Sequence, residues 1–133
     1  MNRWTLLKHE KTINEILDVH YDFLLENGED CKTWKLLILP ELDGPSVKIL
    51  KHSNHRLIWL TIENKLLTND RGYVQRVDNG TFKALGVDIN SSNFSIILKG
   101  NYINGLFIKD FVNTKQFLIL NCQNQAQILK QLI

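Results

Sequence analysis

Residues 20–26, with the sequence HYDFLLE, have the alternating pattern of a β-strand. Side chains point in turn to opposite faces of a strand, so one face is apolar and predicts contact with a core; it holds Tyr21, Phe23 and Leu25. The opposite face presents an imidazole at His20, a carboxylate at Asp22 and an aliphatic group at Leu24. An imidazole and a carboxylate on one strand face can bind the same metal ion. The stretch therefore predicts a half-buried strand whose polar face is interrupted by a leucine.

Around this strand, most of the chain consists of short apolar segments separated by Asn, Asp and Gly, a pattern typical of strands joined by turns. Asn27-Gly28 and Asp78-Asn79-Gly80 are expected to close turns, because these residue types tolerate positive φ. Helix-like spacing is confined to residues 11–18 and 123–133. The chain is thus predicted to be all-β, either a small barrel or a pair of packed sheets with minor helical pieces. We expect strands at residues 4–8, 20–26, 32–39, 72–78, 81–85, 94–98, 102–109 and 116–121.

Length and composition predict one ordinary globular domain. The chain has 133 residues, of which 44% are hydrophobic and 23% charged, so we expect a single domain over residues 1–133. No apolar run approaches the roughly 20 residues that would span a bilayer, and the first residues lack the pattern of a signal peptide. We therefore expect a cytoplasmic protein with no membrane partner. Its two cysteines, Cys31 and Cys122, are expected to be small buried side chains rather than a disulfide.

The charge of the chain limits the nucleic-acid contacts that it can make. The formal net charge is only +2, so a contact would need a local basic patch. Scattered basic residues are usually a solvated surface, and neither a glycine-rich phosphate loop nor a local nucleophile signature is present. The candidates for a phosphate-facing patch are Lys32, Lys35, Arg56, Arg71 and Arg76.

Histidines occur at positions where a β scaffold presents chemistry. His9 ends the first expected strand, His20 begins the second, and His52 and His55 lie in a polar segment. For any one strand histidine, a solvated or internally hydrogen-bonded ring is the commoner interpretation. Two imidazoles and the carboxylate of Asp22 would nevertheless suit zinc, manganese or iron, with coordination positions left open for substrate.

Short motifs in one order connect these residues. The chain resembles the 3′-phosphoesterase domain of bacterial DNA ligase D and its stand-alone relatives over roughly residues 3–120. Each motif is short, but the series in the right order is far more specific than any one of them. The motifs are Leu6-Leu7-Lys8-His9-Glu10, residues 20–26 followed by Gly28, Lys32-Thr33-Trp34, Asn54-His55-Arg56-Leu57, Arg71-Gly72-Tyr73-Val74, Asp78-Asn79-Gly80-Thr81-Phe82, Leu98-Lys99-Gly100 and Asn104-Gly105-Leu106-Phe107.

The resemblance implies a fold, a cofactor and a substrate. The implied fold is a small closed β-barrel of about eight mostly antiparallel strands. The implied cofactor is a divalent metal, manganese or alternatively zinc, and the implied partners are DNA or RNA 3′ ends, from which such domains remove a ribonucleotide and then a 3′-phosphate. The resemblance assigns His9, His20 and Asp22 to the metal, His20 and His55 to catalysis, and His55, Arg56 and Trp59 to substrate binding.

The chain departs from the family pattern at three points, and the first two, together with the weak net charge, favour an alternative. Leu24 replaces an arginine of the ligase-fused members, Trp59 replaces a phosphate-contacting tyrosine, and His9 and His20 lie further apart than usual. An aliphatic side chain cannot replace a guanidinium that binds phosphate, so the chain is alternatively a non-catalytic module that binds nucleic acid or protein. From sequence alone, Leu24→Arg is expected to restore a phosphate contact if the pocket has room for it.

Overall fold

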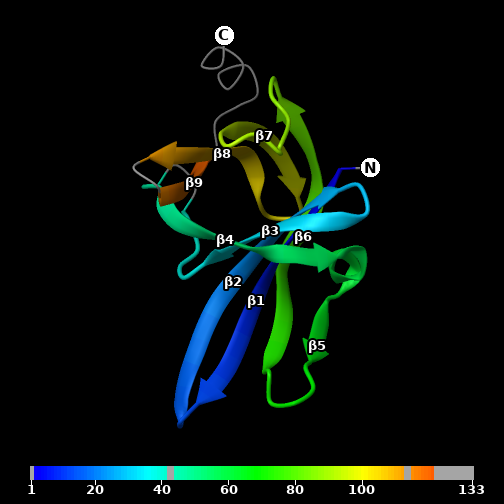
Figure 1. The fold of residues 1–133 in the computed structure, drawn as a ribbon, viewed down its shortest axis with the longest axis vertical. Coiled ribbons are helices and arrows are strands. Elements are labelled where there is room, and N and C mark those ends of the chain that lie inside the picture. The colour runs from blue at the N-terminus through cyan, green and yellow to red at the C-terminus, as the bar shows by residue number, and fades with distance from the viewer. Residues whose placement is uncertain (1, 42–43, 113–114, 122–133) are drawn as a thin grey trace.

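The computed structural model describes residues 2–41, 44–112 and 115–121 and consists mainly of β-strands (Figure 1). A short 3₁₀ helix, η1 (Leu57–Thr61), follows the fourth strand, and no α-helix occurs in the described residues. The expected all-β class is confirmed. The strands are β1 (Arg3–Ile13), β2 (Ile16–Asn27), β3 (Asp30–Leu36), β4 (Val47–Arg56), β5 (Asn64–Leu66), β6 (Tyr73–Leu85), β7 (Phe94–Gly100), β8 (Asn104–Val112) and β9 (Lys115–Asn121).

The strands form one antiparallel sheet that curves round on itself. Pairing runs from β1 through β2, β3, β4, β9, β8 and β7 to β6, which also pairs with β1, and β5 is added to the other edge of β6. β4 and β9 share only three residue pairs, which involve Val47 to Ile49 of β4. After Ile49, the described pairings join β4 to β3 alone, and η1 crosses from β4 toward β5 (Figure 1).

The expectation of a closed barrel is corrected. Although the pairings run in a circuit through β6 and β1, the described pairings leave one edge of β4 beyond Ile49 and one edge of β5 unpaired, so the sheet stays open there. Closure would need partners along both edges of every strand. The side chains of β4 beyond Leu50 are polar and largely exposed. Pairing this part of β4 with a further strand would therefore bury little apolar surface. These exposed residues are Lys51, His52, Ser53 and Asn54.

The larger apolar cluster lies on one face of β1, β2 and β3. It includes Phe23 and Leu25 of β2, with Tyr21 packed against them, so the predicted core face of residues 20–26 is confirmed. Trp4 and Trp34 from the neighbouring strands are 1% exposed and lie in the same cluster. Because large aromatic groups dominate burial, this cluster supplies most of the apolar stabilisation seen in the described residues.

A smaller apolar cluster covers the opposite face, which is also the face of His20 and Asp22. Leu57 and Trp59 of η1 pack against it, so the 3₁₀ helix shields it from solvent. Leu24 has no exposed surface, which makes it a core residue on the polar face of β2. The buried members of this cluster are Leu7, Leu24, Cys31, Leu60 and Val74.

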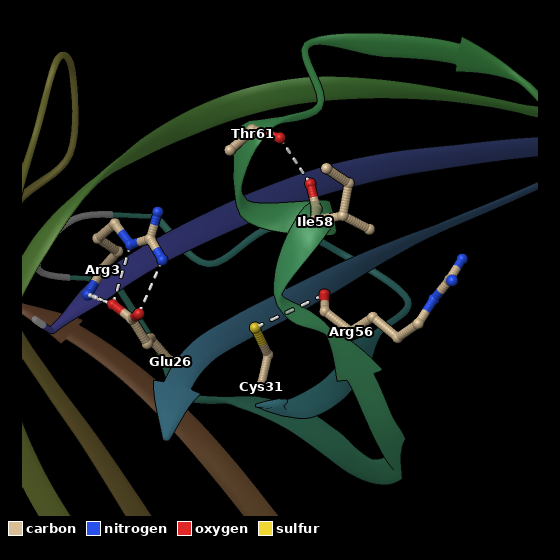
Figure 2. Close-up of polar contacts among 6 residues, drawn as sticks. All are labelled: Arg3, Glu26, Cys31, Arg56, Ile58 and Thr61. Carbon is tan, nitrogen blue, oxygen red and sulfur yellow. Dashed lines mark hydrogen bonds and ion pairs between the residues drawn. The ribbon is translucent and has the colours of Figure 1, made fainter. Parts of the chain in front are cut away.

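Of the two cysteines, Cys31 is buried, as predicted. Figure 2 shows its thiol directed at the carbonyl oxygen of Arg56, 4.0 Å away. Burial raises the pKa of the Cys31 thiol to about 11, so the group stays protonated and unreactive at neutral pH. Cys122 and the expected helix at residues 123–133 lie outside the described residues.

Residues 11–18 form the end of the β1–β2 hairpin rather than the expected helical piece. The turn residues Asn14 and Glu15 have φ of 50° and 66°, as a type I′ hairpin turn requires at both central positions. Ile13 and Ile16 pair directly across this turn. The helix-like spacing fails here because a two-residue turn with positive φ reverses the chain. Of the two turns predicted from the sequence, the one at Asn27-Gly28 is confirmed between β2 and β3.

Asp78-Asn79-Gly80 does not close a turn, because β6 continues through it from Tyr73 to Leu85. The Asp78 side chain instead accepts backbone N–H bonds of 2.7–3.0 Å from Asn79, Asn101, Tyr102 and Ile103. Burial disfavours the charged carboxylate, but these bonds outweigh burial, and the pKa of Asp78 lies below its ordinary value. The motif therefore anchors the β7–β8 turn to β6.

Gly80 completes this anchor. A Cβ atom at this position would lie 1.7 Å from the carbonyl oxygen of Lys99 on β7. Only glycine lets the two backbones approach so closely. The sequence pattern thus marks a structural requirement of the β6–β7 pairing, and not a reversal of the chain.

Candidate metal centre

The β1–β2 hairpin brings His9 and His20 together. The two residues are direct cross-strand partners, and His9 Nδ1 lies 3.2 Å from His20 Nε2. The ten residues between them form further cross-strand pairs and the turn, so the two histidines face each other across the hairpin. The wide spacing along the chain is therefore compatible with one shared site.

Asp22 completes a set of three ligand atoms. Its Oδ2 lies 3.5 Å from His20 Nε2, and the ligand atoms of His9, His20 and Asp22 all lie within 4.8 Å of one another. Two nitrogens bound to one tetrahedral zinc at about 2.0–2.1 Å lie roughly 3.3 Å apart, close to the His9–His20 separation. Asp22 is 7% exposed, and its Oδ1 has no hydrogen-bond partner in the described part of the chain. A buried carboxylate oxygen without a partner fits a metal ligand, and the cluster can hold a metal ion.

A backbone carbonyl orients the ring of His9. His9 Nε2 lies 2.6 Å from the carbonyl oxygen of Arg71, which can only accept, so Nε2 carries the proton. In the neutral ring Nδ1 then has its lone pair free, and this is the atom that faces His20. Such second contacts fix the tautomer of metal-binding histidines.

The loop that supplies this carbonyl has a defined geometry. Asn69 and Asp70 have φ of 57° and 56°, and the N–H of Arg71 donates to Thr68 O at 3.3 Å, as in a type I′ turn. Gly72 follows with φ of 100°, and a Cβ there would lie 2.0 Å from the carbonyl oxygen of Glu10 on β1. Gly72 therefore allows the β5–β6 loop to lie against the strand that carries His9.

Gly72→Ala is expected to weaken metal binding about tenfold, although no ligand is changed. The added methyl group must move the loop away from β1 and with it the carbonyl that orients His9. Isothermal titration calorimetry with manganese measures the effect. Gly28→Ala is the matched control, because Gly28 also has positive φ but nothing lies within 4 Å of its Cβ position. Equal losses in both variants would contradict a specific role of the loop.

The cluster lies in a pocket of about 270 Å³ on the open side of the sheet. Its lining residues come from β1 and β2, from β4 and η1, and from the β5–β6 loop and β6. Five of the six residues that the sequence predicts for the site line this pocket. Its lining residues include the predicted His9, His20, Asp22, His55 and Trp59, together with Leu7, Lys11, His52, Leu67, Arg71 and Val74.

His55 presents one ring nitrogen to this pocket. Its Nδ1 lies 3.1 Å from the carbonyl oxygen of Ser53 and donates to it, so Nε2 is the atom available to a ligand. Burial lowers the pKa of His55 below its ordinary value, which favours the neutral ring at pH 7. The Trp59 ring meets His55 edge-on at 5.9 Å between centroids, and Lys65 Nζ lies 5.7 Å from the Trp59 centroid. Neutral imidazole and indole thus form one wall.

Arg56, the sixth predicted residue, is not among the residues that line the pocket. It pairs with Asp30 at the end of β4, its side chain is exposed, and Figure 2 shows the side chain directed away from Cys31 and η1. The pocket lining also includes Lys11, which the sequence did not point to, and Arg71, which the sequence offered only as one of five candidates for a phosphate-facing patch. The Thr68-Asn69-Asp70-Arg71-Gly72 segment was the available signal, because Asn-Asp before a glycine is typical of a turn.

No protein-family model matches this chain, and a search among curated proteins finds no match either. Among the described residues, no helix is long and apolar enough to cross a membrane.

Proposed function

We propose that this chain is a metal-dependent phosphoesterase-related domain that acts on nucleic-acid 3′ ends, akin to the 3′-phosphoesterase of DNA ligase D. The observation that carries the proposal is the convergence of His9, His20 and Asp22 in one pocket with His55. Three ligands from the protein leave coordination positions for substrate oxygen atoms.

Manganese is the proposed cofactor, with zinc as the alternative. His9 Nδ1, His20 Nε2 and a carboxylate oxygen of Asp22 would hold the ion, because a mixed set of imidazole and carboxylate ligands suits both metals. When bound, a divalent ion neutralises charge on phosphate oxygens. The buried and otherwise unpartnered Oδ1 of Asp22 supports this assignment.

Residues of the chain supply the remaining functions. His55 Nε2 contacts the phosphate, and the neutral ring can accept a proton. His20 would help to hold the ion that neutralises the phosphate. Trp59 offers a flat apolar surface at the pocket wall, which suits stacking of the terminal sugar or base. Arg56 remains a predicted substrate contact only for a nucleic-acid strand that extends beyond the pocket.

His20→Ala is expected to reduce manganese affinity at least about hundredfold, because it removes the central ligand of the cluster. Isothermal titration calorimetry with manganese and with zinc at neutral pH measures this. Asp18→Ala is the control, since Asp18 lies on the same hairpin and is exposed. Absence of binding to the wild-type protein, or equal binding by wild type and His20→Ala, would sink the metal assignment. Release of phosphate from a 3′-phosphorylated primer-template then tests catalysis.

The buried Leu24 favours a second candidate, a non-catalytic module that binds nucleic acid or protein through the same pocket. The position of the family's arginine is occupied by a core side chain, so one source of transition-state stabilisation is missing. Under this candidate, manganese and a 3′-phosphorylated strand still bind, but no phosphate is released. The two measurements together separate the candidates.

A further inference from the structure

Two residues with permanently charged side chains line the pocket. Apart from the histidines, the basic residues that line it are Lys11 on β1 and Arg71 on the β5–β6 loop. Asp22 is the carboxylate among the lining residues, and it belongs to the metal cluster. The remaining wall is apolar or neutral, so a positive charge is available for an anionic ligand beside the metal ligands.

Among the five basic residues that the sequence offers for a phosphate patch, the structure places only Arg71 in the pocket lining. Lys32 donates to the carbonyl of Ile89, and Arg76 is paired with Glu63. Arg56 lies outside the pocket, and Leu24 at the family's arginine position is buried beneath it. The cation that could contact a phosphate at the metal cluster therefore comes from a different element of the fold.

The Arg71 side chain is held in place by its own turn. Its Nε donates to the carbonyl of Thr68 at 3.0 Å and its Nη2 donates to Thr68 Oγ1 at 3.1 Å. The other N–H groups of the guanidinium have no partner within the described part of the chain, so they can donate to a ligand. The backbone carbonyl of the same residue binds His9. Arg71 therefore has two roles: its backbone carbonyl orients His9, and its side chain provides a positive charge that Thr68 holds in place.

We propose that Arg71, assisted by Lys11, binds the phosphate of a ligand held at the His9–His20–Asp22 cluster and takes the place of the cation absent at position 24. This inference rests on the proposed function, because that function supplies the phosphate. A planar guanidinium with free N–H groups forms charge-assisted hydrogen bonds to phosphate oxygens, whereas a lysine acts as a point charge. Arg71 is therefore the main contact and Lys11 the weaker one.

The test compares two DNA duplexes that differ only in a 3′-phosphate or a 3′-hydroxyl on the recessed strand. Fluorescence anisotropy at about 0.15 M ionic strength measures the affinity for each, with manganese and with a chelator, since this salt weakens non-specific attraction. Electrophoresis confirms that the 3′-phosphate is intact. The wild-type protein should bind the 3′-phosphate duplex more tightly than the 3′-hydroxyl duplex. In Arg71→Gln the ratio of these two affinities should fall about tenfold, as expected for the loss of one charge-assisted contact.

Control variants separate this contact from general charge. Arg71→Gln keeps the backbone carbonyl, so its manganese affinity should remain within about twofold of wild type. Lys48→Gln removes one exposed charge outside the pocket and should keep the preference. Arg71→Lys should retain part of the preference for the 3′-phosphate duplex. Lys11→Gln should reduce this preference less than Arg71→Gln does. Circular dichroism and thermal unfolding confirm that each variant is folded.

The outcomes distinguish this inference from the proposed function. An unchanged preference in Arg71→Gln, a loss in Arg56→Gln instead, or no preference in the wild-type protein overturns the role of Arg71. If manganese does not bind but an Arg71-dependent preference persists in the chelator, the metal-dependent function fails while the phosphate contact stands. If manganese binds normally and the preference does not depend on Arg71, only the inference fails.

Discussion

Leu24→Arg is expected to destabilise the protein by about 4 kcal/mol and not to raise phosphate release. Leu24 has no exposed surface and packs with Leu7, Leu60 and Val74 beneath the pocket. An arginine there would bring a charged group into an apolar cluster and would also overfill it. The sequence predicted a restored phosphate contact only if the pocket has room for the arginine. The structure argues against that room, because apolar side chains of β1, η1 and β6 surround Leu24.

Chemical denaturation by urea, followed by tryptophan fluorescence, measures the change in the free energy of unfolding. Leu17→Arg is the matched control: the same substitution on the same strand at a residue that is 58% exposed, with an expected change within about 0.5 kcal/mol. Leu24→Met tests packing alone and should cost less than about 1.5 kcal/mol. A stable Leu24→Arg protein with increased 3′-phosphatase activity would show that the guanidinium reaches the pocket after all.

Asp78→Asn is expected to lower the free energy of unfolding by about 3 kcal/mol at neutral pH. The carboxylate is 2% exposed and accepts four backbone N–H bonds, from Asn79 and from the β7–β8 turn at Asn101 to Ile103. An amide has the same shape, but its NH₂ group would face N–H donors and leave them without acceptors. A loss of this size lowers the melting temperature by roughly 10–15 °C. Asp18→Asn, at an exposed position, is the control.

The pH dependence of this effect has a defined sign. The pKa of Asp78 in the folded protein lies below its ordinary value of 3.8, because the N–H bonds outweigh burial. The charged form therefore stabilises the fold above that value, and the contribution is lost as the pH falls through the folded pKa. The difference in stability between wild type and Asp78→Asn should shrink when the pH is lowered below about 3.8. A difference that stays constant into this acidic range would contradict the assignment.

The sequence by itself determined features that depend on neighbouring residues along one strand. The period of two in residues 20–26 correctly placed Tyr21, Phe23 and Leu25 on a core face and put His20 and Asp22 together on the other. Asn27-Gly28 was a sufficient signal for the β2–β3 turn, because glycine adopts positive φ without strain. Such local rules need no knowledge of the rest of the fold.

Two turns that have no glycine at their central positions were not predicted from the sequence. Asn14-Glu15 and Asn69-Asp70 adopt positive φ at both central residues, although Glu and Asp do so less readily than glycine. Cross-strand pairing and packing hold them in that conformation. The first of these turns sets the His9–His20 register, and the second places Arg71 at the same cluster. Neither contact follows from residue spacing alone.

Only the tertiary structure decided what the leucine at position 24 and the aspartate at position 78 do. Leu24 shares a strand face with two metal-ligand candidates, yet η1 and the β5–β6 region cover it with apolar side chains. Asp78 lies in a turn-like sequence, yet its carboxylate binds a turn more than twenty residues away. The strand period sets the direction of a side chain, whereas its solvent exposure and partners depend on which distant segments pack against it.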